Sequence, residues 1–140
     1  MLNLSKHKLD TGLIESGKPL EIDGGVINVR FVKSQAYKTA LALHLTTTGY
    51  YSEVDKLTDE EKLEKISNAS IVATVASWEG VSFDGKTEAE CTPENILELS
   101  KPEYSVIWDQ IESVSTTESN YKAVVAKKSK NTSSAKAKDA

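Results

Sequence analysis

Hydrophobic and polar residues alternate most clearly between residues 18 and 32. Ile27, Val29 and Phe31 fall on one face of an extended chain, with polar residues between them. Asp23-Gly24-Gly25 precedes this run, and glycine accepts the positive φ angles that a tight turn requires. The pattern predicts a β-hairpin with one buried face. The hairpin must pack against helices, because a lone hairpin is only marginally stable in water.

Four later segments place hydrophobic residues at the spacing of amphipathic helices. Ser34 can cap the first of them, and Thr58 with Glu61 forms a capping box at the start of the second. Pro93 suits the first position of the third helix, and Pro102 begins the fourth in the same way. The helices are expected over residues 35–47, 59–78, 93–99 and 102–115.

The two ends of the chain lack such a regular pattern. Residues 1–17 are expected to form a loosely ordered arm, with a short strand around Leu9 to Ile14. Residues 116–125 predict one more helix. Residues 126–140 consist mainly of Lys, Ser, Ala and Asn and have no apolar face to bury, so a disordered tail is expected there.

These elements predict an α+β protein that is mostly α-helical, with an N-terminal β-hairpin packed on a bundle of about four to five helices. Residues 18–125 would form a single globular domain between the arm and the tail. Burying a tryptophan removes on the order of 150–250 Å² from water, so both tryptophans are expected inside. The predicted structural core comprises Trp78, Trp108, Ile107, Ile111 and Phe31.

The composition fits a globular protein with an ordinary core. The chain has 140 residues, of which 39% are hydrophobic and 27% charged, and this length can bury a core without disulfides or metal ions. A single cysteine, Cys91, excludes an internal disulfide and favours a reducing, intracellular setting. No stretch approaches the ~20 apolar residues of a membrane span, and no signal peptide is recognised, so a membrane partner is not expected.

The charge is distributed unevenly along the chain. The total is −4, but residues 126–140 contain five lysines and one aspartate, which gives this tail +4 and leaves −8 for residues 1–125. An acidic body disfavours a duplex-binding surface, because phosphate contacts need clustered Lys and Arg. Nucleic acid is therefore expected to bind weakly at most, through the basic tail.

Candidate catalytic residues are few. Asp10-Thr11-Gly12 matches the tripeptide of aspartic proteases, but that chemistry needs two such loops in a β-rich fold, and the chain contains one copy. His44 lies on the apolar stripe of the first helix, where a core-edge histidine is expected, and His7 lies in the arm. Neither is spaced with partners for nucleophilic or metal chemistry. The sequence therefore predicts no enzyme activity, no cofactor and no metal.

Tyr50 and Tyr51 are the candidate partner-binding residues. They follow the first predicted helix, where they could pack over the helix end or form a contact surface, since tyrosine is enriched at protein interfaces. Exposed parts of the helix over residues 102–115 are a second candidate surface.

Five short motifs follow one another between residues 18 and 125. They are a hairpin ending in a Val-Arg-Phe strand, a Trp-x-Gly segment, an Asp-Gly-Lys turn, a Thr-Pro-Glu-Asn helix start and an Asn-aromatic pair. The residues are Val29-Arg30-Phe31, Trp78-Glu79-Gly80, Asp84-Gly85-Lys86, Thr92-Pro93-Glu94-Asn95 and Asn120-Tyr121. Over roughly residues 18–125, this order of motifs resembles the tail assembly chaperones of long-tailed bacteriophages and related prophages.

The resemblance implies a function that the composition alone does not. A member of this family would bind the tape-measure protein in the host cytoplasm and help to recruit major tail-tube protein subunits around it, without remaining in the finished particle. Such families often make a longer product by ribosomal frameshifting, and the lysine-rich tail would then begin the linker. A minor virion protein, such as a head–tail connector or a tail-completion protein, is the alternative.

Overall fold

The predicted β-hairpin is confirmed. The computed structural model describes residues 1–123, in which β1 (Lys18–Ile22) and β2 (Gly25–Val29) pair in antiparallel orientation. Asp23 and Gly24 connect them with φ angles of 51° and 86°. Two positive φ angles are typical of the two-residue turn that follows the twist of the flanking strands. The hairpin therefore forms from a local signal, the turn, and from the alternation of its second strand.

The sheet has a third strand where the pattern predicted a helix. α4 (Asp59–Thr74) ends earlier than expected, and β3 (Val75–Glu79) pairs antiparallel with β2, so that the strand order is β1-β2-β3. The predicted helix is therefore wrong beyond Thr74. Without β3, β2 would be an edge strand with unpaired backbone N–H and C=O groups. Residues 75–79 pair with these groups, so a contact with a distant part of the chain makes them a strand.

Arg30 holds the junction between α4 and β3. Its Nη1 donates to the carbonyl oxygens of Ala73 (3.1 Å) and Val75 (3.2 Å). Its backbone N–H donates to the carbonyl of Thr74 (2.8 Å). These bonds satisfy carbonyl groups that the last turn of a helix leaves without partners inside the helix. The chain can therefore leave the helix at Thr74, although Ala76 and Ser77 would fit a helix as well.

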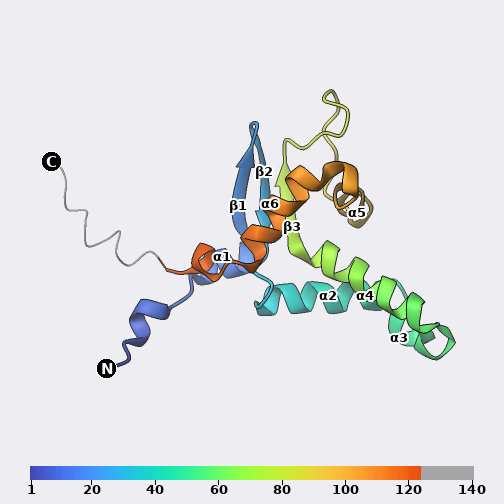
Figure 1. Cartoon of the computed structure of the whole chain (residues 1–140), viewed down its shortest axis with the longest axis horizontal. Coiled ribbons are helices and arrows are strands. Elements are labelled where there is room, and N and C mark those ends of the chain that lie inside the picture. The colour runs from blue at the N-terminus through green and yellow to red at the C-terminus, as the bar shows by residue number, and fades with distance from the viewer. Residues whose placement is uncertain (124–140) are drawn as a thin grey trace.

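Two long helices lie side by side and extend to one side of the sheet (Figure 1). They are α2 (Gln35–Thr47) and α4, joined through α3 (Tyr50–Glu53) and the 3-10 helix η2 (Val54–Lys56). Ala69 and Ala73 of α4 are fully buried, and small side chains of this kind allow the two helices to approach closely. The Tyr37 and Ser70 hydroxyls form a hydrogen bond between the pair (2.5 Å).

The predicted starts of α2 and α4 are confirmed at atomic level. The Ser34 hydroxyl accepts the Tyr37 N–H (3.1 Å) at the start of α2. At the start of α4 the Thr58 hydroxyl accepts the Glu61 N–H (3.1 Å), while the Glu61 carboxylate accepts the Thr58 N–H (2.8 Å). Each pair lies within four residues of sequence, which is why the pattern alone predicted it.

The last two helices cover one face of the sheet. α5 (Pro93–Leu99) begins at the predicted proline, and α6 (Ser105–Thr116) follows the 3-10 helix η3 (Pro102–Tyr104). The structure places Trp78, Trp108, Ile111 and Phe31 in the interior, whereas Ile107 is half-buried at its edge. The main cluster consists of Ile27, Val29, Val75, Trp78, Ile96, Leu99, Trp108 and Ile111.

The N-terminal arm is more regular than its sequence suggests. It contains the 3-10 helix η1 (Leu4–His7) and α1 (Thr11–Ser16) in place of the strand expected around Leu9 to Ile14. The Asp10 carboxylate accepts the Leu13 N–H (3.1 Å), so the Asp-Thr-Gly tripeptide caps a helix. Leu9 forms an isolated antiparallel bridge with Lys122, which joins the arm to the other end of the described chain.

The segment after α6 is anchored by a tyrosine. The helix expected over residues 116–125 is replaced by the 3-10 helix η4 (Glu118–Tyr121), and the tail expected to be disordered lies outside the described residues. Tyr121 is fully buried, its ring stacks on Phe31 (4.8 Å between centroids), and its hydroxyl donates to the Val29 carbonyl (2.7 Å). A continued helix would not deliver this ring to the end of β2.

We expect Tyr121→Phe to lower the free energy of unfolding by about 1–3 kcal/mol, because the substitution removes a buried donor from the Val29 carbonyl. Urea unfolding followed by tryptophan fluorescence measures this change. Tyr51→Phe is the control, since the Tyr51 ring is exposed, and it should change the free energy by less than about 0.5 kcal/mol. Equal effects of the two substitutions would contradict a stabilising role for the buried hydrogen bond.

Candidate protein-binding groove

A groove with a volume of about 410 Å³ opens at the end of the sheet opposite Tyr121. The tip of the hairpin, the loop between β3 and α5, and the segment from Leu99 to Ile107 form its three walls. Its lining is mainly hydrophobic and aromatic. The lining residues are Ile22, Asp23, Gly25, Ile27, Gly80, Val81, Ser82, Phe83, Gly85, Leu99, Tyr104 and Ile107. Here we call this feature the sheet-end groove.

The hairpin wall depends on two glycines that touch. A Cβ atom on Gly25 would lie 2.7 Å from the carbonyl oxygen of Gly80, which is closer than real Cβ contacts allow. Gly80 itself has a φ of +69°, a conformation that other residues adopt at a cost. The two backbones therefore meet without side chains between them, and this contact sets the width of the groove at the hairpin.

The loop wall is built around Asp84. Its Oδ1 accepts the backbone N–H groups of Lys86 (2.8 Å) and Thr87 (2.9 Å) and the hydroxyl of Ser82 (3.0 Å). The bond from Thr87, followed by those from Lys86 and Ser82, lowers the pKa of this exposed carboxyl group from its ordinary value. The ionised carboxylate thus holds the turn that presents Phe83 to the groove.

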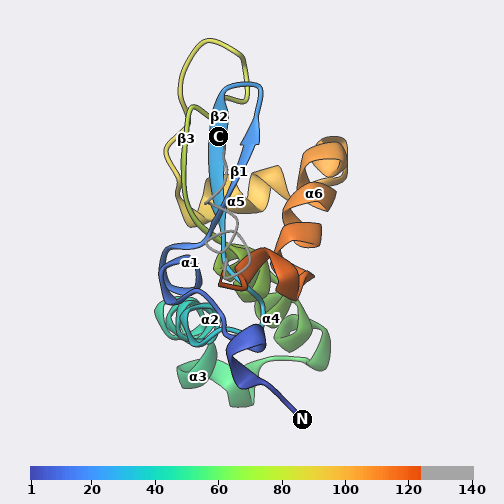
Figure 2. The same ribbon diagram turned by 90° about the vertical axis from the view of Figure 1, so that its left-hand side faces the viewer.

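Two further bonds stabilise the loop, one within it and one to β3. The Ala89 N–H donates to the carbonyl of Val81 (2.7 Å), and the Trp78 indole N–H donates to the carbonyl of Ala89 (2.7 Å). The loop lies beside the hairpin tip in the views of both Figure 1 and Figure 2. Its shape is therefore set by contacts with β3, and the buried indole has its hydrogen-bond partner.

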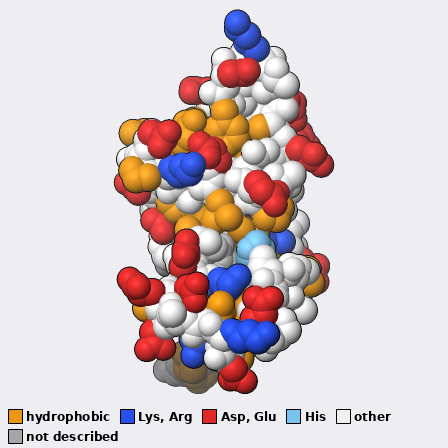
Figure 3. All heavy atoms as spheres, turned by 90° about the vertical axis from the view of Figure 1, so that its right-hand side faces the viewer, with side chains coloured by type: hydrophobic (Ala, Val, Ile, Leu, Met, Phe, Trp, Pro, Cys, Tyr) orange, Lys and Arg blue, Asp and Glu red, His pale blue; other side chains and the backbone are white. Residues whose placement is uncertain are grey.

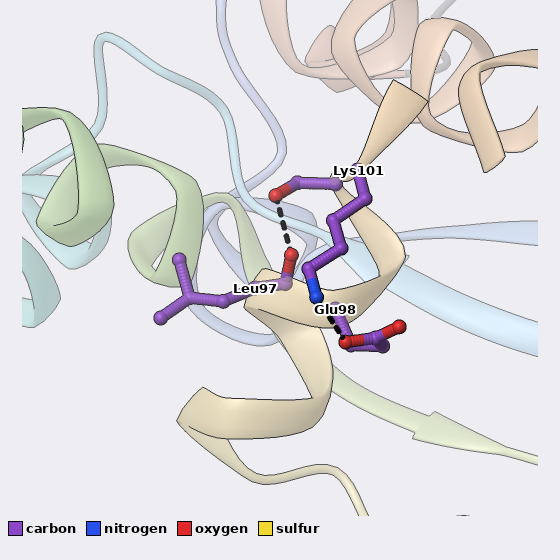
Figure 4. A network of polar contacts seen from close by, with 4 residues as sticks. Leu97, Glu98 and Lys101 are labelled. Carbon is purple, nitrogen blue, oxygen red and sulfur yellow. Dashed lines mark hydrogen bonds and ion pairs between the residues drawn. The ribbon is translucent and has the colours of Figure 1, made fainter. Parts of the chain in front are cut away.

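The helical wall is shaped by the connection between α5 and α6. Ser100 ends α5 by donating its hydroxyl to the Leu97 carbonyl (2.7 Å), and Lys101 pairs with Glu98 (2.8 Å), as Figure 4 shows. This exposed ion pair contributes little to stability, because water screens it. The turn then brings Tyr104 edge-on against Phe83, with 5.4 Å between ring centroids. Rings from the loop and the helix thus close one end of the groove.

The chemistry of the sheet-end groove favours binding through apolar contact. Asp23 is its one charged lining residue, and the polar atoms come from Ser82, Tyr104 and the backbone. Within residues 1–123, no group of three His, Cys, Asp or Glu side chains could hold a metal ion. On the face shown in Figure 3, hydrophobic side chains gather in patches bordered by charged ones, the arrangement of a contact surface with a polar rim.

The candidate partner-binding tyrosines lie elsewhere. Tyr50 and Tyr51 belong to α3, and their rings meet edge to face with 5.3 Å between centroids. Tyr51 is 56% exposed and Tyr50 is half-buried, and neither lines the sheet-end groove. Val81 and Phe83, in the loop between β3 and α5, do line the sheet-end groove. The sequence did not predict that these two residues would lie in one groove with Ile107, because the fold brings them together from distant parts of the chain.

The remaining candidates have local structural roles. Asp10 caps α1, His7 is exposed in η1, and His44 is half-buried in α2. None of the three lines the sheet-end groove. In the part of the chain that the structure describes, no helix is both long and apolar enough to cross a membrane.

The contact between the two glycines predicts a specific sensitivity. Gly25→Ala should lower the free energy of unfolding by about 1–3 kcal/mol, because the new methyl group forces two backbones apart. Gly12→Ala in α1 is the control: its Cβ would meet only the Asp10 side chain at 3.2 Å, and alanine favours helix. The same urea titration measures both variants. A neutral Gly25→Ala would show that the contact does not constrain the groove.

The Asp84 turn predicts a pH effect. Ser82→Ala should raise the pKa of Asp84 toward its ordinary value, because one of its donors is lost. Since the folded-state pKa is lowered, the contribution of this turn is present above the ordinary Asp pKa. It is lost as the pH falls through the lowered value. An NMR titration of the Asp84 carboxyl carbon measures the shift, with Glu88→Gln as the control that should leave it unchanged.

No known protein family, curated protein or solved structure matches the chain. The functional conclusion therefore rests on the shape and chemistry of the groove and on the motifs that form its walls.

Proposed function

We propose that the protein is a tail assembly chaperone of a long-tailed bacteriophage or prophage. It binds the tape-measure protein in the host cytoplasm and helps to recruit major tail-tube protein subunits, without enzyme activity and without a cofactor. One observation supports this proposal above all. Trp78-Glu79-Gly80 and Asp84-Gly85-Lys86, which carry much of the resemblance to such chaperones, lead into or form one wall of the sheet-end groove.

The groove suits a helical client. An amphipathic helix binds by laying its apolar face into a hydrophobic groove, where anchors at positions such as i, i+3 and i+4 fill it. A volume of about 410 Å³ can take a few such side chains. Each fully buried Leu, Ile or Phe side chain contributes roughly 1.5–3 kcal/mol, so a few anchors give an affinity that remains reversible. Reversible binding suits a protein that must leave its client as the tail tube assembles.

Tyr50 and Tyr51 contribute a second contact in this proposal. Tyr51 is among the most exposed aromatic side chains of the described residues, and tyrosine supplies large contact area with little conformational freedom to lose. The two surfaces lie on separate elements, one at the end of the sheet and the other at the turn between α2 and α4. A long client could therefore touch both.

Co-expression with the tape-measure protein of the same phage, followed by affinity purification and size-exclusion chromatography, tests the proposal. The tape-measure protein should become soluble only in the presence of this chain, and several copies should co-purify with each client. Ile107→Glu should abolish the complex, because it places a charge in the groove. Leu63→Glu adds the same charge on α4, at a residue that is 69% exposed and does not line the groove, and should leave the complex intact.

Circular dichroism and urea unfolding establish whether Ile107→Glu is folded, and Phe83→Ser probes the groove from the loop if it is not. The Tyr50→Ala/Tyr51→Ala double variant tests the second contact, which is rejected if the variant folds and binds the client normally. If the client stays insoluble and this chain elutes alone, the chaperone function is wrong. Detection of the chain in purified particles would then favour a minor virion protein, such as a connector or tail-completion protein.

A further inference from the structure

A second groove runs along α2 and shares no residue with the sheet-end groove. It consists of two hollows, of about 560 Å³ and 250 Å³, which have Arg30, Ala40 and Leu43 in common. Thr11, Ile14 and Gln35 line the larger hollow, and Val72, Ala76 and Pro93 line the smaller one. Arg30 therefore lies where the two hollows meet. We call this feature the α2 groove.

The guanidinium group of Arg30 is only partly satisfied. Nη1 makes the two bonds that hold the α4–β3 junction, whereas Nε and Nη2 have no hydrogen-bond partner among residues 1–123. No carboxylate of the described chain lies within 4.0 Å of it, although Glu15 lines the same hollow. The structural task of Arg30 thus uses one of three nitrogen atoms and leaves a planar fork of donors for another acceptor.

The surroundings strengthen the attraction of this cation for a carboxylate. Arg30 is partly buried, and desolvation lowers its pKa from the ordinary arginine value, which still leaves it fully charged at neutral pH. A charge with reduced hydration gains more from a direct partner than an exposed one. The first turn of α2 lines the larger hollow, and the positive end of the helix dipole also favours a negative group.

Hydrophobic surface lies on both sides of the cation. The Leu43 side chain is 62% exposed, although it stands between the two hollows. Ile14 in the larger hollow and Val72 in the smaller one provide apolar contacts beyond it. The described residues contain no other segment that covers Leu43. A ligand matched to this groove combines one negative group with apolar groups before and after it.

We propose that the α2 groove binds a peptide segment of a partner protein that places a single Asp or Glu carboxylate on Arg30, between apolar side chains that cover Leu43. One carboxylate fits better than a run of acidic residues, because residues 1–125 carry a net charge of −8 and Glu15 lies in the same hollow. An arginine fork and a carboxylate form paired, charge-assisted hydrogen bonds, which make the recognition geometrically specific. This site is independent of the sheet-end groove.

A displayed library of random 12-residue peptides, selected against the full-length protein, tests the proposal. The library should enrich peptides with one Asp or Glu flanked by apolar residues. Replacing that acid with Asn or Gln in a synthetic peptide should weaken binding at least about tenfold, the loss expected for one charge-assisted pair. Fluorescence anisotropy with the labelled peptide measures the affinity. NMR shifts of the Arg30 Nε–H and the Leu43 methyl groups report whether the peptide occupies the groove.

Leu43 gives a matched set of variants on an exposed position. Leu43→Glu should weaken binding of the acidic peptide about tenfold or more, whereas Leu43→Lys should keep the binding within a few-fold of the wild type. Val106→Glu, which adds the same charge on α6, should have no effect. Arg30→Gln should abolish binding of the peptide. Arg30→Lys keeps the charge but lacks the planar fork of donors, and it should weaken binding as well.

Three results would overturn the proposal. The library could enrich no peptide, or only peptides without an acidic residue. The acid and amide peptides could bind equally. Leu43→Glu and Val106→Glu could have the same effect, which would place the peptide elsewhere. None of these experiments uses the tape-measure protein, so their failure is distinguishable from failure of the proposed chaperone function.

Discussion

Residues 29–32, at the end of β2 and directly after it, connect the sheet to α4, α6 and the C-terminal segment. The Val29 carbonyl accepts the Tyr121 hydroxyl (2.7 Å), the Arg30 guanidinium holds the end of α4, and the Phe31 ring stacks on Tyr121. The Ser115 hydroxyl donates to the Arg30 carbonyl (2.7 Å), and the Val32 N–H donates to the Ser115 carbonyl (3.0 Å). The sheet, α4, α6 and the C-terminal segment are thus tied at one place by buried polar groups, which are costly to leave unpaired.

This arrangement explains why the two grooves lie where they do. The interior at the tied end of β2 is filled by the buried rings of Tyr121 and Phe31. At the opposite end the strands meet through Gly25 and Gly80, and the absence of side chains there opens the sheet-end groove. Arg30 lines the α2 groove while its Nη1 donates to the carbonyls of Ala73 and Val75 at the α4–β3 junction, so that part of its guanidinium remains accessible beside α2.

The two grooves differ in their chemistry. The sheet-end groove offers apolar surface and suits the hydrophobic face of a helix, whereas the α2 groove combines apolar surface with one cation and suits a segment that carries an acid. Their different chemistry would let a chaperone hold two kinds of segment at once, either in one long client or in two partners. In both grooves the free energy of binding would come from the burial of apolar surface and, in the α2 groove, from one charge pair.

The sequence by itself determined the features whose signals are local. The turn at Asp23-Gly24, the caps at Ser34, Thr58 and Thr92, and the amphipathic stripes could be predicted because every interacting pair lies within a few residues. Only the tertiary structure decided that residues 75–79 form a strand, that Tyr121 enters the core and that the groove walls meet. In these cases the deciding partner lies far away in the chain, as Tyr121 lies from Val29, and hydrophobic periodicity contains no information about which distant partner a residue will find.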